Sequence, residues 1–415
     1  MTAESSNASP PKRKLRWYQF SLRTLLILTA ACAIPCAWLG TRITHKRNER
    51  EVVALIVKWG GNVVYDYQKE ANAPPPGPAW LRNWFGDDFF GEVDYIRLHG
   101  KSVTPSDLAY FKGLTQLRTL ELGEHNVTDD GLESLEGLTQ LQYLVLSDTN
   151  VGDAGLAHLA GLSRLEELGL RLTKITDAGL THVKGLTQLQ YLNLDGTKVG
   201  DDGLANLEDL TQLQLLNLDN TKVTGRGLAH LSRLSALEVL NLHGTKVGDR
   251  GLGHLRGLTQ LRELDLSSTS VSDAGMVNLD RSPRLESISF ARTQVGDETL
   301  SHIARLTKLH TLNMISTNIS DAGLKSIAGS TTLNELNLSK TAVSDAGLVH
   351  LKRLTHLWYL DLSETRISDR GLESLRGLTE LNRVRVVGTE VTDAEVQSLQ
   401  QALPSSASLI VDTET

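Results

Sequence analysis

The chain has 415 residues and a formal net charge of −7 at pH 7. This mild acidity excludes a general nucleic-acid binder, because such proteins carry clustered positive charge. The only two cysteines, Cys32 and Cys36, lie in one apolar segment, so the rest of the chain has neither disulfides nor thiol chemistry.

The N-terminal region combines a basic tail with an apolar run. Residues 1–20 are polar and end in grouped cations, which predicts a disordered basic tail. Residues 21–41 include the uncharged stretch Thr24–Thr41. As a helix this stretch is about 27 Å long, just enough to cross a hydrocarbon core of about 30 Å. Trp17, Tyr18 and Trp38 flank it like an aromatic belt, so we predict a transmembrane helix over 21–41.

A cleaved signal peptide is the alternative interpretation of this segment. The length of the run and the lack of a small-residue cleavage site after it favour a retained, single-pass membrane anchor. Cations lie on both sides of the run, so the charge rule for orientation is nearly balanced. The short N-terminal tail with its tightly grouped charge favours repeats on the non-cytoplasmic side, and the opposite orientation stays open.

The segment between the apolar run and the repeats has two predicted parts. Residues 42–70 are predicted to form a juxtamembrane helix and a short strand. Residues 71–92 combine a proline-rich linker with the aromatic stretch Trp80–Gly91. Because the end of a repeat stack must be covered, we expect this stretch to form an N-terminal cap. An aromatic ligand-binding patch is the alternative.

Residues 93–403 form a repeat domain with a constant period of 24 residues. The series begins at Val93, and no insertion interrupts it. One unit, Leu141–Leu162, places Leu144 and Leu146 on one face of a strand. The leucines after Asp153 recur every three residues, which predicts a helix of about two turns. Such a unit buries its leucines only against its neighbours, so the pattern indicates a solenoid. The repeating leucines are Leu117, Leu141, Leu165, Leu189, Leu213, Leu237, Leu261, Leu285, Leu309, Leu333, Leu357 and Leu381.

Three further columns recur at the same period. Thr149 and its equivalents place a hydroxyl where the strand ends, suited to unpaired backbone groups. Asp153 and its equivalents precede each helix, which predicts N-caps worth about 1 kcal/mol each. A row of calcium ligands is the rival interpretation, but each unit supplies only one carboxylate. Gly155 and its equivalents suggest close backbone approach between units.

These motifs resemble the leucine-rich repeat family. LxxLxLxxT followed by VTDAGLxxLxGL is most similar to the cysteine-containing subclass, whose units carry an ITDxGLxxL stretch, as in Ile175–Leu180. Threonine stands where that subclass has cysteine. The resemblance implies an α/β solenoid, a right-handed superhelix of about 13 units, with a concave parallel sheet and convex short helices. The N-terminal block resembles membrane-anchored leucine-rich repeat proteins of planctomycete-type bacteria.

The sequence offers no catalytic constellation. Nucleotide-binding loops, metalloprotease helices and serine elbows are missing from it, so we predict no enzyme activity, no cofactor and no small-molecule substrate. His158, His182 and His230 share one slot in the helical segment. Asparagine and serine also fill this slot and no carboxylate partner is evident, so we predict a polar column and no metal site.

The outward face of the predicted strands carries the candidate binding site. Exposed tyrosines beside apolar residues are typical of interface anchors. We therefore predict recognition of a protein or peptide on the concave face. A purely structural asparagine ladder is the alternative for the asparagines, and a structural or adhesive envelope protein or a substrate-recognition subunit for the whole chain. The candidate residues are Tyr143, Val145, Tyr191, Asn193, Asp195, Leu215, Asn217, Asp219 and Asn241.

Residues 404–415 form the predicted C-terminal cap and tail. Pro404 ends the last helix of the repeat domain. Residues 408–411 are predicted to add a closing strand over the core.

Overall fold

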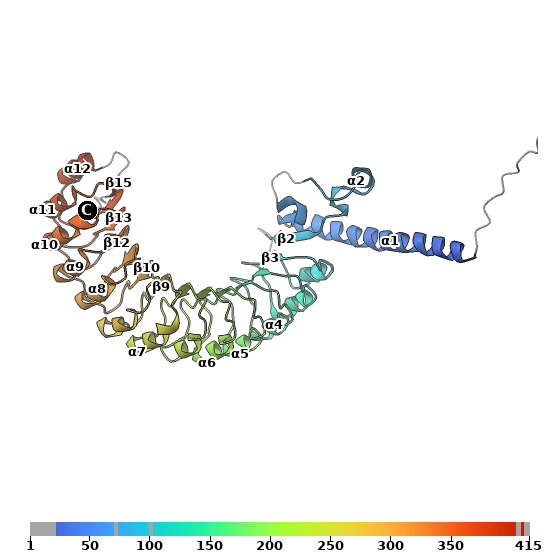
Figure 1. Cartoon of the computed structure of the whole chain (residues 1–415), viewed down its shortest axis with the longest axis horizontal. Coiled ribbons are helices and arrows are strands. Elements are labelled where there is room, and N and C mark those ends of the chain that lie inside the picture. Colours follow the sequence, from blue (N-terminus) through green and yellow to red (C-terminus); the bar gives the residue numbers. More distant parts are fainter. Residues whose placement is uncertain (1–21, 70–73, 99–102, 404–407, 411–415) are drawn as a thin grey trace, which may run out of the picture.

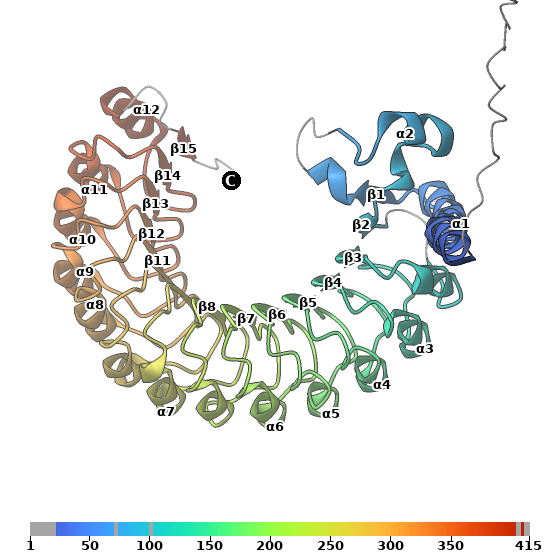
Figure 2. The same ribbon diagram turned by 45° about the vertical axis from the view of Figure 1, so that its right-hand side comes forward.

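The computed structural model describes residues 22–69, 74–98, 103–403 and 408–410. The predicted disordered tail over 1–20 lies outside these residues, as does most of the predicted C-terminal tail. Within them the chain forms a curved solenoid whose strands line the inner side of an arc and whose helices line the outer side (Figures 1 and 2).

One sheet of 15 strands runs through the molecule in chain order. β1 (Asn62–Tyr65) pairs antiparallel with β2 (Val93–Arg97), and every later neighbour pair is parallel. From β2 to β14, each strand residue pairs with the residue 24 positions further on, as Leu144 does with Leu168, and β14 pairs with β15 at an offset of 25. The predicted solenoid with a concave parallel sheet is confirmed. The remaining strands are β3 (Thr119–Glu121), β4 (Tyr143–Val145), β5 (Glu167–Gly169), β6 (Tyr191–Asn193), β7 (Leu215–Asn217), β8 (Val239–Asn241), β9 (Glu263–Asp265), β10 (Ser287–Ser289), β11 (Thr311–Asn313), β12 (Glu335–Asn337), β13 (Tyr359–Asp361), β14 (Arg383–Arg385) and β15 (Ser408–Ile410).

The helices on the outer side are shorter than the two turns predicted. Most consist of one α-helical turn, often followed by a tighter 3₁₀ turn. A spacing of three between leucines suits a 3₁₀ helix, which has 3.0 residues per turn, so the leucine pattern never required a longer α-helix. The helices are α3 (Asp129–Leu132), α4 (Asp153–Ala157), α5 (Asp177–Leu180), α6 (Asp201–Leu204), α7 (Asp249–Leu252), α8 (Asp297–Ile303), α9 (Asp321–Ile327), α10 (Asp345–Leu348), α11 (Asp369–Leu372) and α12 (Asp393–Ala402).

The space between sheet and helices is filled by one continuous leucine core. Leu141, Leu144 and Leu146 are fully buried, as are their equivalents in the following units. The threonine column closes each turn over this core. Thr149 Oγ1 donates to the carbonyl oxygen of Leu146 at 2.6 Å, and its ten equivalents make the same bond. The predicted role of these hydroxyls is confirmed.

The aspartates do not cap their own helices, so that prediction was wrong. The N-cap is the preceding residue, as Thr176 is for α5. Asp153 instead reaches into the next unit, where its two oxygens accept the Thr176 backbone N–H at 2.7 Å and the Thr176 hydroxyl at 2.6 Å. A Cβ on Gly179 would lie 2.4 Å from Asp153 Oδ1, which explains the glycine column. Gly225 has no carboxylate and cannot form this contact between units.

The N-terminal end of the core is closed mainly by α1 (Leu22–Lys58). Residues 22–58 form one continuous helix, and Val52, Ile56 and Trp59 pack into the leucine core. α2 (Ala79–Phe85) lies beside α1, and its Trp80 and Trp84 stay exposed. Phe89 of the same stretch is buried, and the role of the stretch as a cap stays a prediction. At the other end, β15 pairs with β14, as expected for a closing strand.

Candidate functional site on the concave face

Tyr143, Glu167 and Tyr191 form a row across three neighbouring strands of the concave face. They occupy the first positions of β4, β5 and β6, and the sheet register pairs Tyr143 with Glu167 and Glu167 with Tyr191. Adjacent parallel strands lie about 4.8 Å apart, so the carboxylate stands between two phenol rings. Both rings are well exposed, at 37% and 39%, whereas Glu167 is half-buried. We call these three residues the Tyr–Glu–Tyr row.

The Glu167 carboxylate at the centre of the row lies in an environment that disfavours its negative charge. Burial and the neighbouring Glu121 raise the pKa of Glu167. Glu121 is itself engaged, because it accepts the Tyr95 hydroxyl at 2.9 Å and pairs with Arg97 at 3.0 Å. Among the described residues no cation pairs with Glu167. A cation placed there would gain a carboxylate partner between two exposed tyrosine residues.

The asparagines of the predicted site have a structural task. Asn193 Oδ1 accepts the backbone N–H of Asp195 at 3.0 Å, and Asn217 and Asn241 make the same bond two residues along. This bond holds the chain as it leaves the strand. This bond lies within one unit and is not the ladder between strands that the alternative interpretation described.

The two aspartates of the predicted site already have charged or polar partners. Asp195 pairs with Arg171 at 2.9 Å, and Arg171 also reaches Asp148 at 2.7 Å. Asp219 lies 2.6 Å from His243 Nδ1. These carboxylates are less available to a ligand than that of Glu167.

The residues of the predicted site therefore fall into two groups: those that face solvent and those whose polar groups already have partners within the protein. Tyr143 and Tyr191 face solvent, and Val145 and Leu215 add half-buried apolar surface beside them. Glu167 was missed, although the 24-residue period alone places it between the two tyrosines. Its signal in the sequence was one acidic residue between two tyrosines at the first strand position of successive units.

The histidine column is polar, as predicted, but three of its members have carboxylate partners that the sequence did not reveal. His158 Nδ1 lies 2.6 Å from Glu136, and His230 and His302 make equivalent contacts with Glu208 and Asp280. Each partner stands 22 residues earlier, in the preceding unit, which is why no local motif reveals it. These pairs join successive units on the outer side.

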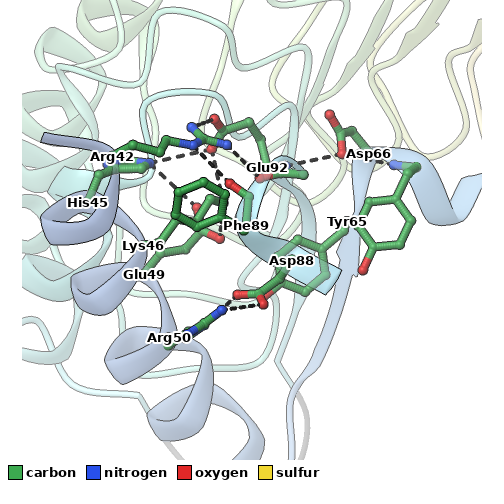
Figure 3. A network of polar contacts seen from close by, with 12 residues as sticks. Arg42, His45, Lys46, Glu49, Arg50, Tyr65, Asp66, Asp88, Phe89 and Glu92 are labelled. Carbon is green, nitrogen blue, oxygen red and sulfur yellow. Dashed lines mark hydrogen bonds and ion pairs between the residues drawn. The ribbon is translucent and has the colours of Figure 1, made fainter. Parts of the chain in front are cut away.

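A second polar cluster lies where α1 meets the start of the solenoid (Figure 3). Lys46 is almost fully buried, and its ammonium contacts Glu49 at 2.5 Å and Glu92 at 3.4 Å. Burial raises the pKa of Glu49 to about 7 despite Lys46. Burial also disfavours the charge of Glu92, but Arg42 and Lys46 more than offset it and lower the pKa of that carboxyl.

This cluster has part of the chemistry of a metal site. One ligand atom each of His45, Glu49 and Glu92 lies within 4.8 Å of the others. The Lys46 ammonium contacts both carboxylates and already supplies the positive charge that a metal ion would bring. The arrangement therefore serves as an ionic clamp between α1 and the segment before β2.

Comparison with known proteins agrees with the geometry. A family model described as "Leucine-rich repeat region" matches residues 101–291, and a second, "Leucine Rich repeat", matches 305–328, 329–351 and 353–375. The chain belongs to the leucine-rich repeat family. Its assignment to the cysteine-containing subclass stays a prediction. A search of curated proteins finds no match.

Two solved leucine-rich repeat structures share the fold. An internalin from Listeria monocytogenes is 24% identical, with a TM-score of 0.56 over 75% of this chain and 90% of the internalin. A leucine-rich repeat protein of Leptospira interrogans is 16% identical, with a TM-score of 0.51 over 83% of this chain and 94% of its own. The fold is typical of recognition scaffolds without catalytic activity.

Proposed function

We propose that this leucine-rich repeat protein is a membrane-anchored scaffold that binds a protein or peptide partner on its concave face, without catalysis. A lysine or arginine side chain of the partner sits on the Tyr–Glu–Tyr row. The observation that carries this proposal is the half-buried, unpaired Glu167 between two exposed tyrosines.

The physical case rests on the difference between this row and the surface around it. Tyrosine side chains are rigid and amphipathic and are enriched at binding hot spots. Burial and the neighbouring Glu121 raise the pKa of Glu167, so a nearby cation would stabilise its ionised form. The other concave carboxylates that we predicted to bind, Asp195 and Asp219, already have partners.

The shape of the sheet suits an extended partner. Fourteen parallel strands about 4.8 Å apart give a concave surface roughly 60 Å long. A peptide or protein edge lying across the strands meets a new unit every 4.8 Å or so. The Tyr–Glu–Tyr row would fix the position of one basic side chain, and the rest of the surface would add weaker contacts.

The membrane part of the proposal rests on α1. Its N-terminal part is long and apolar enough to cross a bilayer, with a mean hydropathy of 1.6 and none of that window buried. A signal sequence passes the same test. The C-terminal part of α1 is built into the core through Val52 and Ile56, and α1 continues without a break past Thr41. Cleavage at the end of the apolar run would therefore cut inside a helix, which favours a retained anchor.

Photo-crosslinking tests the binding site. Tyr191 is replaced by p-benzoylphenylalanine in cells that make the protein, and adducts are identified by mass spectrometry. The same residue at exposed Lys184, on the helix side of the unit, is the control. We expect a partner adduct only from position 191, and Glu167→Gln should abolish it.

A matched substitution separates Glu167 from general surface charge. Glu263 occupies the first strand position of β9 in the same concave row and is exposed. Glu263→Gln should leave the adduct intact. Equal loss with both substitutions, or an adduct that survives Glu167→Gln, would contradict the proposed site.

Orientation is tested separately. Repeats on the non-cytoplasmic side are digested by external protease in intact cells, whereas repeats in the cytoplasm are protected. The mass of the mature N-terminus distinguishes a retained anchor from a cleaved signal peptide.

A further inference from the structure

We propose that Trp80 and Trp84 of α2 insert into the interfacial layer of the bilayer that α1 crosses. They would form a second membrane contact beside the anchor. This inference rests on the proposed membrane anchoring and adds a lipid-binding surface to it.

The first argument is exposure. Among the large apolar side chains of the described residues, the four most exposed are Trp84 at 83%, Ile34 at 71%, Ile27 at 68% and Trp80 at 66%. All four lie on α1 or α2, at one end of the protein. Trp80 and Trp84 are four residues apart, so they share one face of α2. Neither makes a ring contact with another aromatic side chain in the described part of the chain.

The second argument is position along α1. Arg42 is the first charged residue after the apolar run. Its Nε donates to the Phe89 carbonyl at 2.9 Å and its Nη2 to the Gly91 carbonyl at 3.2 Å. Arg50 donates to Asp88 at 2.6 Å and also to the carbonyl of Phe85, the last residue of α2.

These contacts hold α2 beside the first turns of α1 beyond the apolar run. Arg42 and Arg50 are separated by about 12 Å along the helix axis, at about 1.5 Å per residue. That interval begins where the hydrocarbon core ends and extends through the headgroup region. Figure 1 shows α2 next to the inner half of α1, with the outer half projecting beyond the rest of the protein.

Tryptophan is the residue that physical chemistry places at this depth. Its large ring leaves water, while its indole N–H keeps a polar partner among the headgroups. Nearby Arg47 pairs with Glu51 at 3.4 Å, and its side chain remains 78% exposed and suited to anionic headgroups. A single helix leaves the protein free to rotate about the helix axis. A second contact, offset from that axis, would fix how the solenoid faces the membrane.

Depth-dependent fluorescence quenching tests the proposal on the full chain in phosphatidylcholine vesicles. Three proteins each keep one reporter tryptophan together with buried Trp59, and the other four tryptophans are changed to phenylalanine. Trp84 reports on the proposed contact, Trp38 on the anchor, and Trp358, on the solenoid, serves as the negative control. Lipids brominated near the headgroup end of their chains supply the quencher.

We expect brominated lipid to quench most of the emission of Trp38 and Trp84 and to leave Trp358 unchanged. Quenching of Trp38 without Trp84 would overturn the interfacial contact and leave the anchor standing. Quenching of neither would overturn both proposals. A Trp84 emission shifted to the blue but not quenched would show that protein, such as a second copy, covers α2, and would also overturn the contact.

Trp59 is retained in all three proteins to preserve their folding. Trp59 is buried and its ring lies 6.3 Å from that of Tyr110, so Trp59→Phe is the change most apt to disturb folding. Keeping Trp59 in all three proteins gives each the same background emission. The comparison between Trp38, Trp84 and Trp358 then still decides the outcome.

Discussion

Replacing Gly179 by alanine should weaken the contact between two successive repeats. The new Cβ would lie 2.4 Å from Asp153 Oδ1 and 3.2 Å from Asp153 Cα. The carboxylate must therefore move or the units must separate. Either change disturbs the bonds that Asp153 accepts from the backbone N–H and the hydroxyl of Thr176.

The magnitude follows from two opposing terms. A hydrogen bond to a charged group contributes about 1.5–3 kcal/mol, and the displaced carboxylate loses at least one. Alanine in a helix gains up to about 1 kcal/mol over glycine. The difference predicts a net destabilisation of about 1–2 kcal/mol for Gly179→Ala. Gly161→Ala, whose Cβ would meet nothing within 4 Å, should be neutral or slightly stabilising.

Urea unfolding of the full chain, followed by circular dichroism, measures these changes. Because long repeat arrays need not unfold in one step, hydrogen exchange at the Thr176 amide gives the local value. A double mutant tests the cause. In an Asp153→Ala background the carboxylate is gone, so Gly179→Ala should cost little more. An equal cost in both backgrounds, or a cost no larger than that of Gly161→Ala, would refute the reasoning.

Three further predictions follow from single side chains. Thr197→Val removes one of the two donors to the buried Leu194 carbonyl, which keeps the Thr197 backbone N–H, and should cost about 1 kcal/mol in urea unfolding, whereas exposed Lys198→Ala should cost nothing. The pKa of Glu49 is about 7 in the folded protein and 4.5 in the reference state. Its contribution to stability is therefore full below pH 4.5 and is lost as the pH rises through about 7. Glu49→Gln should flatten this loss in unfolding curves measured across that range; an unchanged slope would contradict the assignment. Because a bound cation favours ionised Glu167, affinity for the partner should rise as pH increases through its raised pKa, and Glu167→Gln should remove this dependence in titrations.

The register of the sheet was predictable from the sequence because the repeat period alone determines how the strands of a solenoid pair. Once Leu144 and Leu168 stand 24 residues apart, the register of β4 and β5 is determined, and each later strand up to β14 repeats it. The position of Glu167 between two tyrosines follows from the same period. Its raised pKa does not, because burial depends on how tightly neighbouring side chains pack.

The contact of Asp153 with the next unit could not be predicted from local sequence patterns. Asp153 lies next to two sets of backbone N–H groups, those of its own helix and those of the next unit. Local propensity favoured the first, and the structure uses the second. The recurring glycines did indicate this contact, because Gly179 leaves room for the Asp153 carboxylate. The ionic clamp had no comparable signal, because Lys46 and Glu92 are far apart in the chain and meet only after folding.

Selection from a random peptide library tests the central claim most directly. The full chain, held in lipid nanodiscs, is the target, and the Glu167→Gln protein is the counter-target. We predict that the peptides retained by the native chain share a lysine or arginine and lose binding to the Glu167→Gln protein. Enriched peptides that lack a basic residue, or that bind both proteins equally well, would contradict recognition through the Tyr–Glu–Tyr row.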